Sequence, residues 1–145
     1  MKQRVRARGH EHVTARHAST FEVTSDDYLT PAGDCILAVD ADHTPADFDE
    51  AFGGACQDRS ARIVVTLETT DDTGTVTYRE RVTGQGHPEL TFESDRSLVW
   101  RTSEYVDDRT VAVGMERAAA ELDRSLVHAL AGGAGLRVTL TVEPP

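Results

Sequence analysis

The most constraining feature of this sequence is that its second half resembles its first. The motif R-V-x-x-x-G-H occupies 4–10 and recurs at 81–87. Further matches keep the same order: 13–28 with 90–105 at an offset of 77, 34–52 with 108–126 at 74, and 63–68 with 138–143 at 75. The series predicts an internal duplication. A chain of 145 residues fits one domain, residues 1–145, built from repeats at about 1–70 and 75–145.

Each repeat has the pattern strand, strand, strand, helix, strand. In the first, strands are predicted at 4–8, 14–24, 35–39 and 63–67 from apolar alternation and one continuous apolar run. Thr44 and Pro45 give a helix start, with Gly53-Gly54 as its end. The second repeat has strands at 110–113 and 136–142, apolar residues at helical spacing from 115 to 129, and Gly132-Gly133 as a helix stop. A turn at 71–74 joins the repeats.

These elements predict an α+β, β-rich fold. One repeat is too small to cover both faces of its sheet, so two copies should close around a shared core as a pseudo-twofold β-barrel with two helices. The pair Gly33-Asp34 before a buried strand resembles the Gly-Asp box of cradle-loop barrels, which include double-psi barrels. The second repeat has Asp107-Asp108 at that place.

The charge is strongly acidic and unevenly distributed. The chain has 25 Asp and Glu against 15 Lys and Arg, and Lys2 is its one lysine. Dispersed carboxylates with a net charge of −10 favour adaptation to high salt, and an acidic protein with basic partners is the alternative. Residues 1–17 carry +4, which leaves −14 for the rest. This first segment could bind a phosphate or an acidic partner, or pair with the protein's own carboxylates.

Several classes of protein are excluded or disfavoured by the sequence. No apolar run approaches the length of a membrane-spanning helix, and the N-terminus lacks the apolar stretch of a signal peptide, so we predict neither membrane insertion nor export. Cys35 and Cys56 form no disulfide framework and lack zinc spacing, which favours the cytoplasm. No phosphate-binding glycine loop, nucleophile elbow, DNA-binding motif or basic-aromatic RNA motif is present. We predict no cofactor.

The two Gly-His motifs are the first candidates for chemistry. His10 and His87 occupy equivalent positions, so a twofold axis could bring them together as a general acid and base. The alternative is that each imidazole bonds the backbone at a strand bend, which the glycine permits. His10 and His12 share a strand face and could bind a metal with His17, but no carboxylate or cysteine stands at ligand spacing, and we predict no metal site.

A polar cluster near the predicted axis is the other candidate. It contains Arg96, Arg101, Arg109, Asp34 and Glu22. Guanidinium groups near free backbone N–H groups bind phosphate or carboxylate well. The alternative is that these arginines only brace the fold, for example Arg109 with Asp34.

Three blocks of the sequence resemble an archaeal family known as domain of unknown function 371. They are RGHEHVTARHASTFEVTSDDYLTPAGDCILAVDAD, GQGHPELTFESDRSLVWRTSEYV and RTVAVGMERAAAELDRSL. The resemblance implies an archaeal cytoplasmic protein and brings no established activity. The family's lysine after each buried strand is replaced here by His43 and Arg117. A role that needs a deprotonated lysine amine is therefore in doubt, whereas Arg117 could keep a positive charge.

Together these features predict a module that binds an anionic ligand, either a phosphorylated small molecule or RNA, at the pseudo-twofold cleft. An enzyme that uses His10 and His87 for acid–base catalysis is the alternative, and a structural or assembly subunit is a second one. No DNA or membrane partner is expected, and the oligomeric state stays open.

Overall fold

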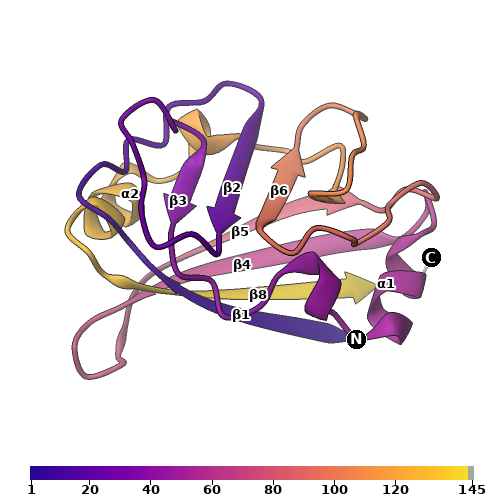
Figure 1. The fold of residues 1–145 in the computed structure, drawn as a ribbon, viewed down its shortest axis with the longest axis horizontal. Coiled ribbons are helices and arrows are strands. Elements are labelled where there is room, and N and C mark those ends of the chain that lie inside the picture. Colours follow the sequence, from indigo (N-terminus) through magenta and orange to yellow (C-terminus); the bar gives the residue numbers. More distant parts are fainter. Residues whose placement is uncertain (144–145) are drawn as a thin grey trace.

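The structure, a computed structural model that describes residues 1–143, has two four-stranded sheets with one helix at either end (Figure 1). The first sheet has the order β1-β8-β4-β5 and is antiparallel throughout. Its strands are β1 (Lys2–Arg8), β8 (Gly135–Glu143), β4 (Arg62–Thr70) and β5 (Val76–Gln85). The second has the order β3-β2-β6-β7, with β3 (Ile36–Ala38), β2 (Thr20–Thr24), β6 (Ser97–Arg101) and β7 (Thr110–Ala112). The predicted α+β class with two helices is confirmed.

The prediction of a closed barrel goes beyond this arrangement. Within residues 1–143 the sheets are linked at their corners by single antiparallel bridges, Arg8 with Val39 and Gln85 with Val113. The strands that would have to close the barrel, β3 and β7, are only three residues long. They are too short to extend a ladder along β1 and β5.

Both helices begin later than the sequence predicts. Thr44 precedes a 3₁₀ turn, Pro45–Asp47, and the chain then extends at Phe48 before α1 (Glu50–Cys56). In the second half a turn at Ala119–Glu121 precedes α2 (Arg124–Ala131). The true N-caps are Asp49 and Asp123, whose carboxylates each accept a backbone N–H at 2.8 Å.

The glycine pairs differ in their relation to these helices. Gly53 and Gly54 lie inside α1 and do not end it, whereas Gly132 caps α2 and Gly133 follows with a φ of 88°. The ring of Phe92 lies beside Gly53, where an added Cβ would stand 3.4 Å from it. The prediction of a helix stop was therefore wrong for the first pair and confirmed for the second.

Irregular backbone conformations recur at equivalent positions of the two halves. Ala15 and Phe92, which correspond at the offset of 77, have φ values of 49° and 53°. Asp40 and Gly114, which correspond at the offset of 74, both have a φ of 58°. The bounds of strands β4 and β8 differ by 73 positions, two fewer than the offset of 75 inferred from their apolar residues. The two-repeat organisation remains a prediction, and these matched features are what a duplication would produce.

The core lies between the two sheets and under both helices. It includes Phe21 and Trp100, whose rings stack at 4.9 Å between centroids on the inner face of the second sheet. The first sheet contributes apolar residues at alternate positions, including Val5, Leu67 and Val138. Because successive residues of a strand face opposite sides, the outer face of each sheet is left for polar side chains.

Candidate functional site

The outer face of the second sheet is the first candidate site, because the predicted twofold axis would pass through it. Glu22 of β2 pairs with Val99 of β6, and the offset of 77 makes these two residues equivalent. Polar side chains flank this pair, and Thr20, Thr24 and Ser97 are each at most 9% exposed. This polar face therefore lies away from the core and is nevertheless shielded from solvent.

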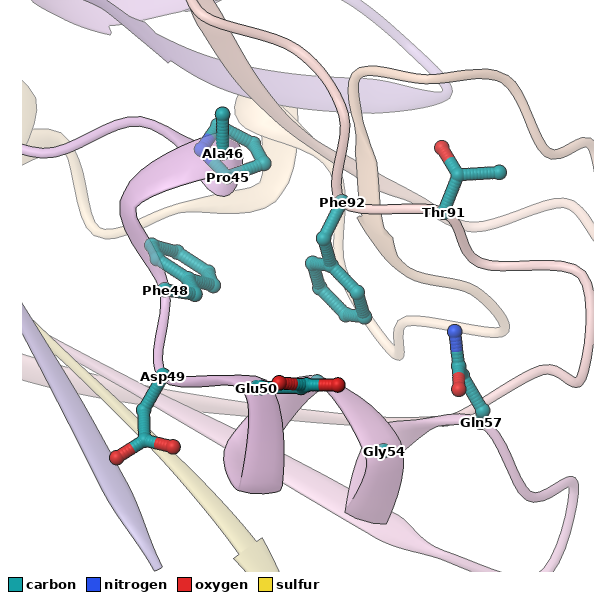
Figure 2. Close-up of a pocket in the computed structure, with 10 residues that line it drawn as sticks. Pro45, Ala46, Phe48, Asp49, Glu50, Gly54, Gln57, Thr91 and Phe92 are labelled. Carbon is teal, nitrogen blue, oxygen red and sulfur yellow. The ribbon is translucent and has the colours of Figure 1, made fainter.

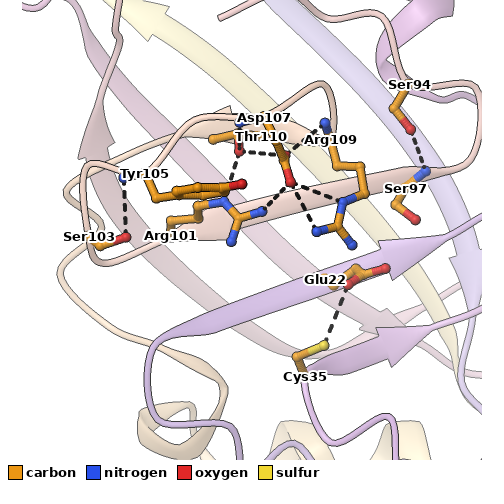
Figure 3. Close-up of polar contacts among 10 residues, drawn as sticks. All are labelled: Glu22, Cys35, Ser94, Ser97, Arg101, Ser103, Tyr105, Asp107, Arg109 and Thr110. Atoms are coloured by element: carbon orange, nitrogen blue, oxygen red, sulfur yellow. Dashed lines mark hydrogen bonds and ion pairs between the residues drawn. The ribbon is translucent and has the colours of Figure 1, made fainter.

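Arg101, at the end of β6, is the centre of a hydrogen-bonded cluster on this face (Figure 3). Its guanidinium donates to the Thr110 hydroxyl at 2.8 Å and to the Asp107 carboxylate at 3.0 Å, and it lies 4.8 Å from the centre of the Tyr105 ring. Arg109 donates to the same oxygen of Asp107 at 3.0 Å. The side chain of Arg101 is only 11% exposed, so its charge is already satisfied inside the protein.

The surroundings set the ionisation of two groups in the cluster. Partial burial opposes ionisation of Asp107, but hydrogen bonds from Arg109 and Thr110 and the charge of Arg101 outweigh it and lower the pKa of Asp107 to about 2. Burial, reinforced by the nearby carboxylate of Glu22, raises the pKa of Cys35 to about 12. The Cys35 thiol lies 3.5 Å from Glu22 and is held protonated.

Glu22 lies on the same face of the neighbouring strand β2, whereas Arg96 and Asp34 are bonded to other residues. Arg96 donates through two nitrogens to Asp26, at 2.7 and 3.0 Å. The backbone carbonyl of Asp34 accepts the N–H groups of Arg16 and His17, and Asp34 is not the partner of Arg109. The structure thus brings Arg101 and Arg109 together around Asp107, a partner that the sequence did not single out. These ion pairs favour bracing of the fold at this face over an open anion site.

The two Gly-His motifs lie at opposite ends of the molecule. His10 lies in a depression beside the end of α2, and the N–H of His87 bonds the Cys56 carbonyl at the end of α1 (Figure 1). In each motif the imidazole Nδ1 accepts the backbone N–H two residues later, at 3.1 Å for His10 and 3.0 Å for His87. The histidines therefore do not form a shared pair. Their contacts are those of a loop-bracing role.

The outer face of the first sheet carries the second candidate site, a group of cations that we call the cationic face. In the middle row across the sheet, Arg4 pairs with Thr139, Thr139 with Thr66, and Thr66 with Arg81. This row would be symmetric about the predicted twofold axis, because an offset of 77 relates Arg4 to Arg81 and one of 73 relates Thr66 to Thr139. The cationic face comprises Lys2, Arg4, Arg6, Arg79, Arg81 and Arg137, which surround Glu68.

Most of these cations have no carboxylate of their own. Glu68, which is 8% exposed, pairs with Arg79 at 2.7 Å. Among residues 1–143, no carboxylate lies within 4.0 Å of the charged nitrogens of Arg4, Arg6 or Arg137. Six cations and one carboxylate give this face a charge of +5, which leaves −15 on the rest of the chain. A shallow depression lined by Arg4, Arg6, Glu68, Arg137 and Thr139 marks its centre.

The sequence revealed only half of the cationic face. The +4 charge of residues 1–17 pointed to β1, but β5 was not recognised as its counterpart. The signal was present, since basic residues alternate at Arg4 and Arg6 and again at Arg79 and Arg81.

In the part of the chain that the structure describes, no three His, Cys, Asp or Glu side chains gather as a metal site. No helix in that part has the length and apolar character needed to cross a bilayer.

Comparison with known proteins places this fold in a family without an assigned role. Residues 5–143 match the family described as Domain of unknown function (DUF371), and the chain belongs to that family. It is similar to the uncharacterized protein MJ0206 of the archaeon Methanocaldococcus jannaschii. The two are 33% identical over 129 residues, which is 89% of this chain and 90% of the relative.

Proposed function

We propose that this protein binds RNA through the cationic face of its first sheet. The observation that carries the proposal is the concentration of six cations on one face of a chain whose net charge is −10. A positive surface on a strongly negative body attracts a polyanion to that surface and repels it elsewhere, so it also orients the partner.

The extent of the face favours a polyanion over a small phosphorylated molecule. The row from Arg4 to Arg81 crosses four strands, which is about 14 Å at the usual strand spacing. Lys2 and Arg6 are separated by a further span of about 14 Å along β1. One phosphate group would engage one or two of these guanidinium groups. A nucleic-acid backbone presents many phosphates in sequence and can engage several at once.

The chemistry of the face favours contacts to the RNA backbone over contacts to bases. Its cations alternate with threonines, including Thr66, Thr139 and Thr141, and none of its defining residues is aromatic. Proteins that bind splayed single strands stack bases on aromatic side chains. Arginine forks with threonine hydroxyls suit phosphates and 2′-hydroxyl groups, which an RNA duplex displays regularly.

The test is fluorescence anisotropy of a labelled RNA hairpin titrated with the protein at several salt concentrations. The variant is Arg4→Gln with Arg81→Gln, and the control is Arg16→Gln with Arg59→Gln, two exposed arginines outside the face. We expect the variant to bind at least tenfold more weakly, since each charge-assisted contact contributes about 1.5–3 kcal/mol. The slope of log affinity against log salt should fall by about 1.8, as for two lost duplex phosphate contacts. Equal losses in variant and control would refute the proposal.

The arrangement of His10 and His87 does not favour the alternative hypothesis of acid–base catalysis by a histidine pair. The histidines sit at opposite ends, and each Nδ1 accepts a backbone N–H, so any catalysis would use them singly. The structural-subunit hypothesis predicts no RNA affinity in the wild type or in either arginine variant.

We also propose that the acidic remainder of the surface is an adaptation to high salt in a cytoplasmic protein. A charge of −15 outside the cationic face destabilises the compact state by repulsion, and salt screens that repulsion. The melting temperature should therefore rise when KCl is increased from low to molar concentration, and a melting temperature that is independent of KCl would contradict the adaptation.

A further inference from the structure

A pocket beside α1 has a composition that neither the cationic face nor the arginine cluster shares. Phe48 and Phe92 flank it, with 5.9 Å between their ring centroids, and Gln57 and Glu50 stand along its helical side (Figure 2). Pro45, Asp49 and Thr91 are among the other residues that line it. Aromatic rings with an acidic side chain at the rim suit a cationic group better than an anion.

The equivalent place in the second half of the chain is filled by the side chain of Arg124. Its guanidinium donates only to backbone carbonyls: Leu122 at 3.0 Å, Ala15 at 3.1 Å, Ala119 at 2.6 Å and Thr14 at 3.5 Å. This niche is therefore built from carbonyl oxygens that converge on one guanidinium.

The pocket beside α1 is the counterpart of that niche, residue by residue. At the offset of 74, Leu122 corresponds to Phe48 and Ala119 to Pro45. At the offset of 77, Thr14 corresponds to Thr91 and Ala15 to Phe92. All four counterparts line the pocket. The position of Arg124 itself is taken by Glu50, an exposed carboxylate. The first half thus keeps the backbone of a guanidinium niche and replaces the resident guanidinium by a group of opposite charge.

The local packing is consistent with a niche that has been kept open. Val127 and Ala15 of the second niche are replaced by Gly53 and Phe92, so the larger ring stands where the helix has lost a side chain. Among residues 1–143, the carbonyl oxygens of Phe48, Thr91 and Phe92 accept no hydrogen bond from the chain. These acceptors are available to a ligand that supplies N–H donors.

We propose that this pocket binds a guanidinium group supplied by another molecule, either a small guanidino compound or an arginine side chain of a partner. The planar guanidinium has five N–H donors, which match several carbonyl acceptors at once, and its faces stack on aromatic rings. Glu50 would balance the charge of a bound guanidinium in this pocket, whereas Arg124 supplies the guanidinium of the other niche. An ammonium group lacks the planar fork and should bind more weakly.

The test is a titration of the ¹⁵N-labelled protein with methylguanidine, followed by backbone amide shifts. Saturable shifts are expected at residues around the pocket, with methylammonium at least fivefold weaker. Glu50→Gln should weaken binding about two- to fivefold, the effect of one exposed ion pair. Glu50→Arg should abolish it, because the new side chain can occupy the pocket as Arg124 occupies its own niche.

A control and a second ligand complete the experiment. Glu104→Arg makes the same charge change at an exposed residue away from the pocket and should leave methylguanidine binding unchanged. A blocked Gly-Arg-Gly peptide that binds at least tenfold more tightly than methylguanidine would identify the source as an arginine of a partner, and equal affinities would identify a free guanidino compound. Absence of saturable shifts, equal binding of methylammonium, or full binding by Glu50→Arg would overturn the proposal. None of these outcomes depends on RNA binding.

Discussion

Replacing Gly86 by alanine should cause a large loss of stability, because the backbone of another element lies where the methyl group would be. A Cβ at Gly86 would overlap the carbonyl oxygen of Cys56 and would lie 2.6 Å from the carbonyl oxygen of Asp58. Gly86 has no positive φ, so the glycine is needed for space and not for conformational freedom. This refines the expectation that the glycine of each Gly-His motif permits a bend.

The magnitude follows from the atoms that must move. Overpacking a core site costs about 1–3 kcal/mol, and main-chain atoms cannot escape by changing rotamer, so the upper value applies. The shift would also strain two hydrogen bonds, Gly86 N–H to Ala61 at 3.0 Å and His87 N–H to Cys56 at 3.1 Å, each with a net contribution of about 1 kcal/mol. We expect a loss of about 3–5 kcal/mol, or about 10–15 °C in melting temperature for a chain of this size.

Urea denaturation followed by circular dichroism measures this difference. The control is Gly54→Ala, since a Cβ there meets nothing within 4 Å and should stabilise the helix by about 0.5–1 kcal/mol. Gly9→Ala should behave like Gly86→Ala, because its Cβ would lie 2.7 Å from the Leu130 carbonyl carbon at the end of α2. A Gly86→Ala protein whose stability lies within about 0.5 kcal/mol of the wild type, as for an ordinary surface substitution, would refute the reasoning.

Three further predictions concern single side chains. Asp107→Asn should cost about 2 kcal/mol at neutral pH, the free energy linked to the lowered pKa of this carboxylate. Because the folded pKa of about 2 lies below the unfolded value of 3.8, this difference should be complete above pH 3.8 and disappear as pH falls toward 2; a difference that persists at pH 2 in urea titrations would contradict it. Cys35 and Cys56, with pKa values raised to about 12 mainly by burial, should resist iodoacetamide at pH 8 in the native protein and react in urea, as mass spectrometry would show. Arg124→Ala should destabilise the fold by about 2–3 kcal/mol, because it leaves several carbonyls without their charged donor, and calorimetry showing no change would exclude that role.

The order of elements could be predicted from local pattern, whereas their boundaries depended on tertiary contacts. Alternating apolar residues indicated the closing strands at 63–67 and 136–142, and the structure has β4 and β8 there. The start of α1 was placed too early because Thr44 and Pro45 do initiate a turn, which Asp47 closes by accepting the Thr44 N–H at 2.9 Å. Whether such a turn continues as a helix is decided by what packs against it.

The candidate site residues show a similar division. Charged side chains could be identified in the sequence, but their partners come from segments that only the fold brings together. Arg96 is paired with Asp26, 70 positions away, and no local spacing signals that contact. The pairing of Asp107 with Arg101 is not signalled although the two are close in the sequence, because a loop must fold back to bring them together.

By itself, the sequence determined the α+β class, the strong negative charge and the positive first segment, and it predicted the repetition, because each of these follows from residue type and periodicity. Only the tertiary structure decided that β1 and β5 present one continuous cationic face, since strand register fixes which side chains share a side. It also decided that two nearly equivalent niches differ, one filled by Arg124 and one open beside Glu50. That difference depends on atoms from two segments far apart in the sequence meeting at one place, 14–15 with 119–124 in one niche and 45–57 with 91–92 in the other, which the linear order of residues does not contain.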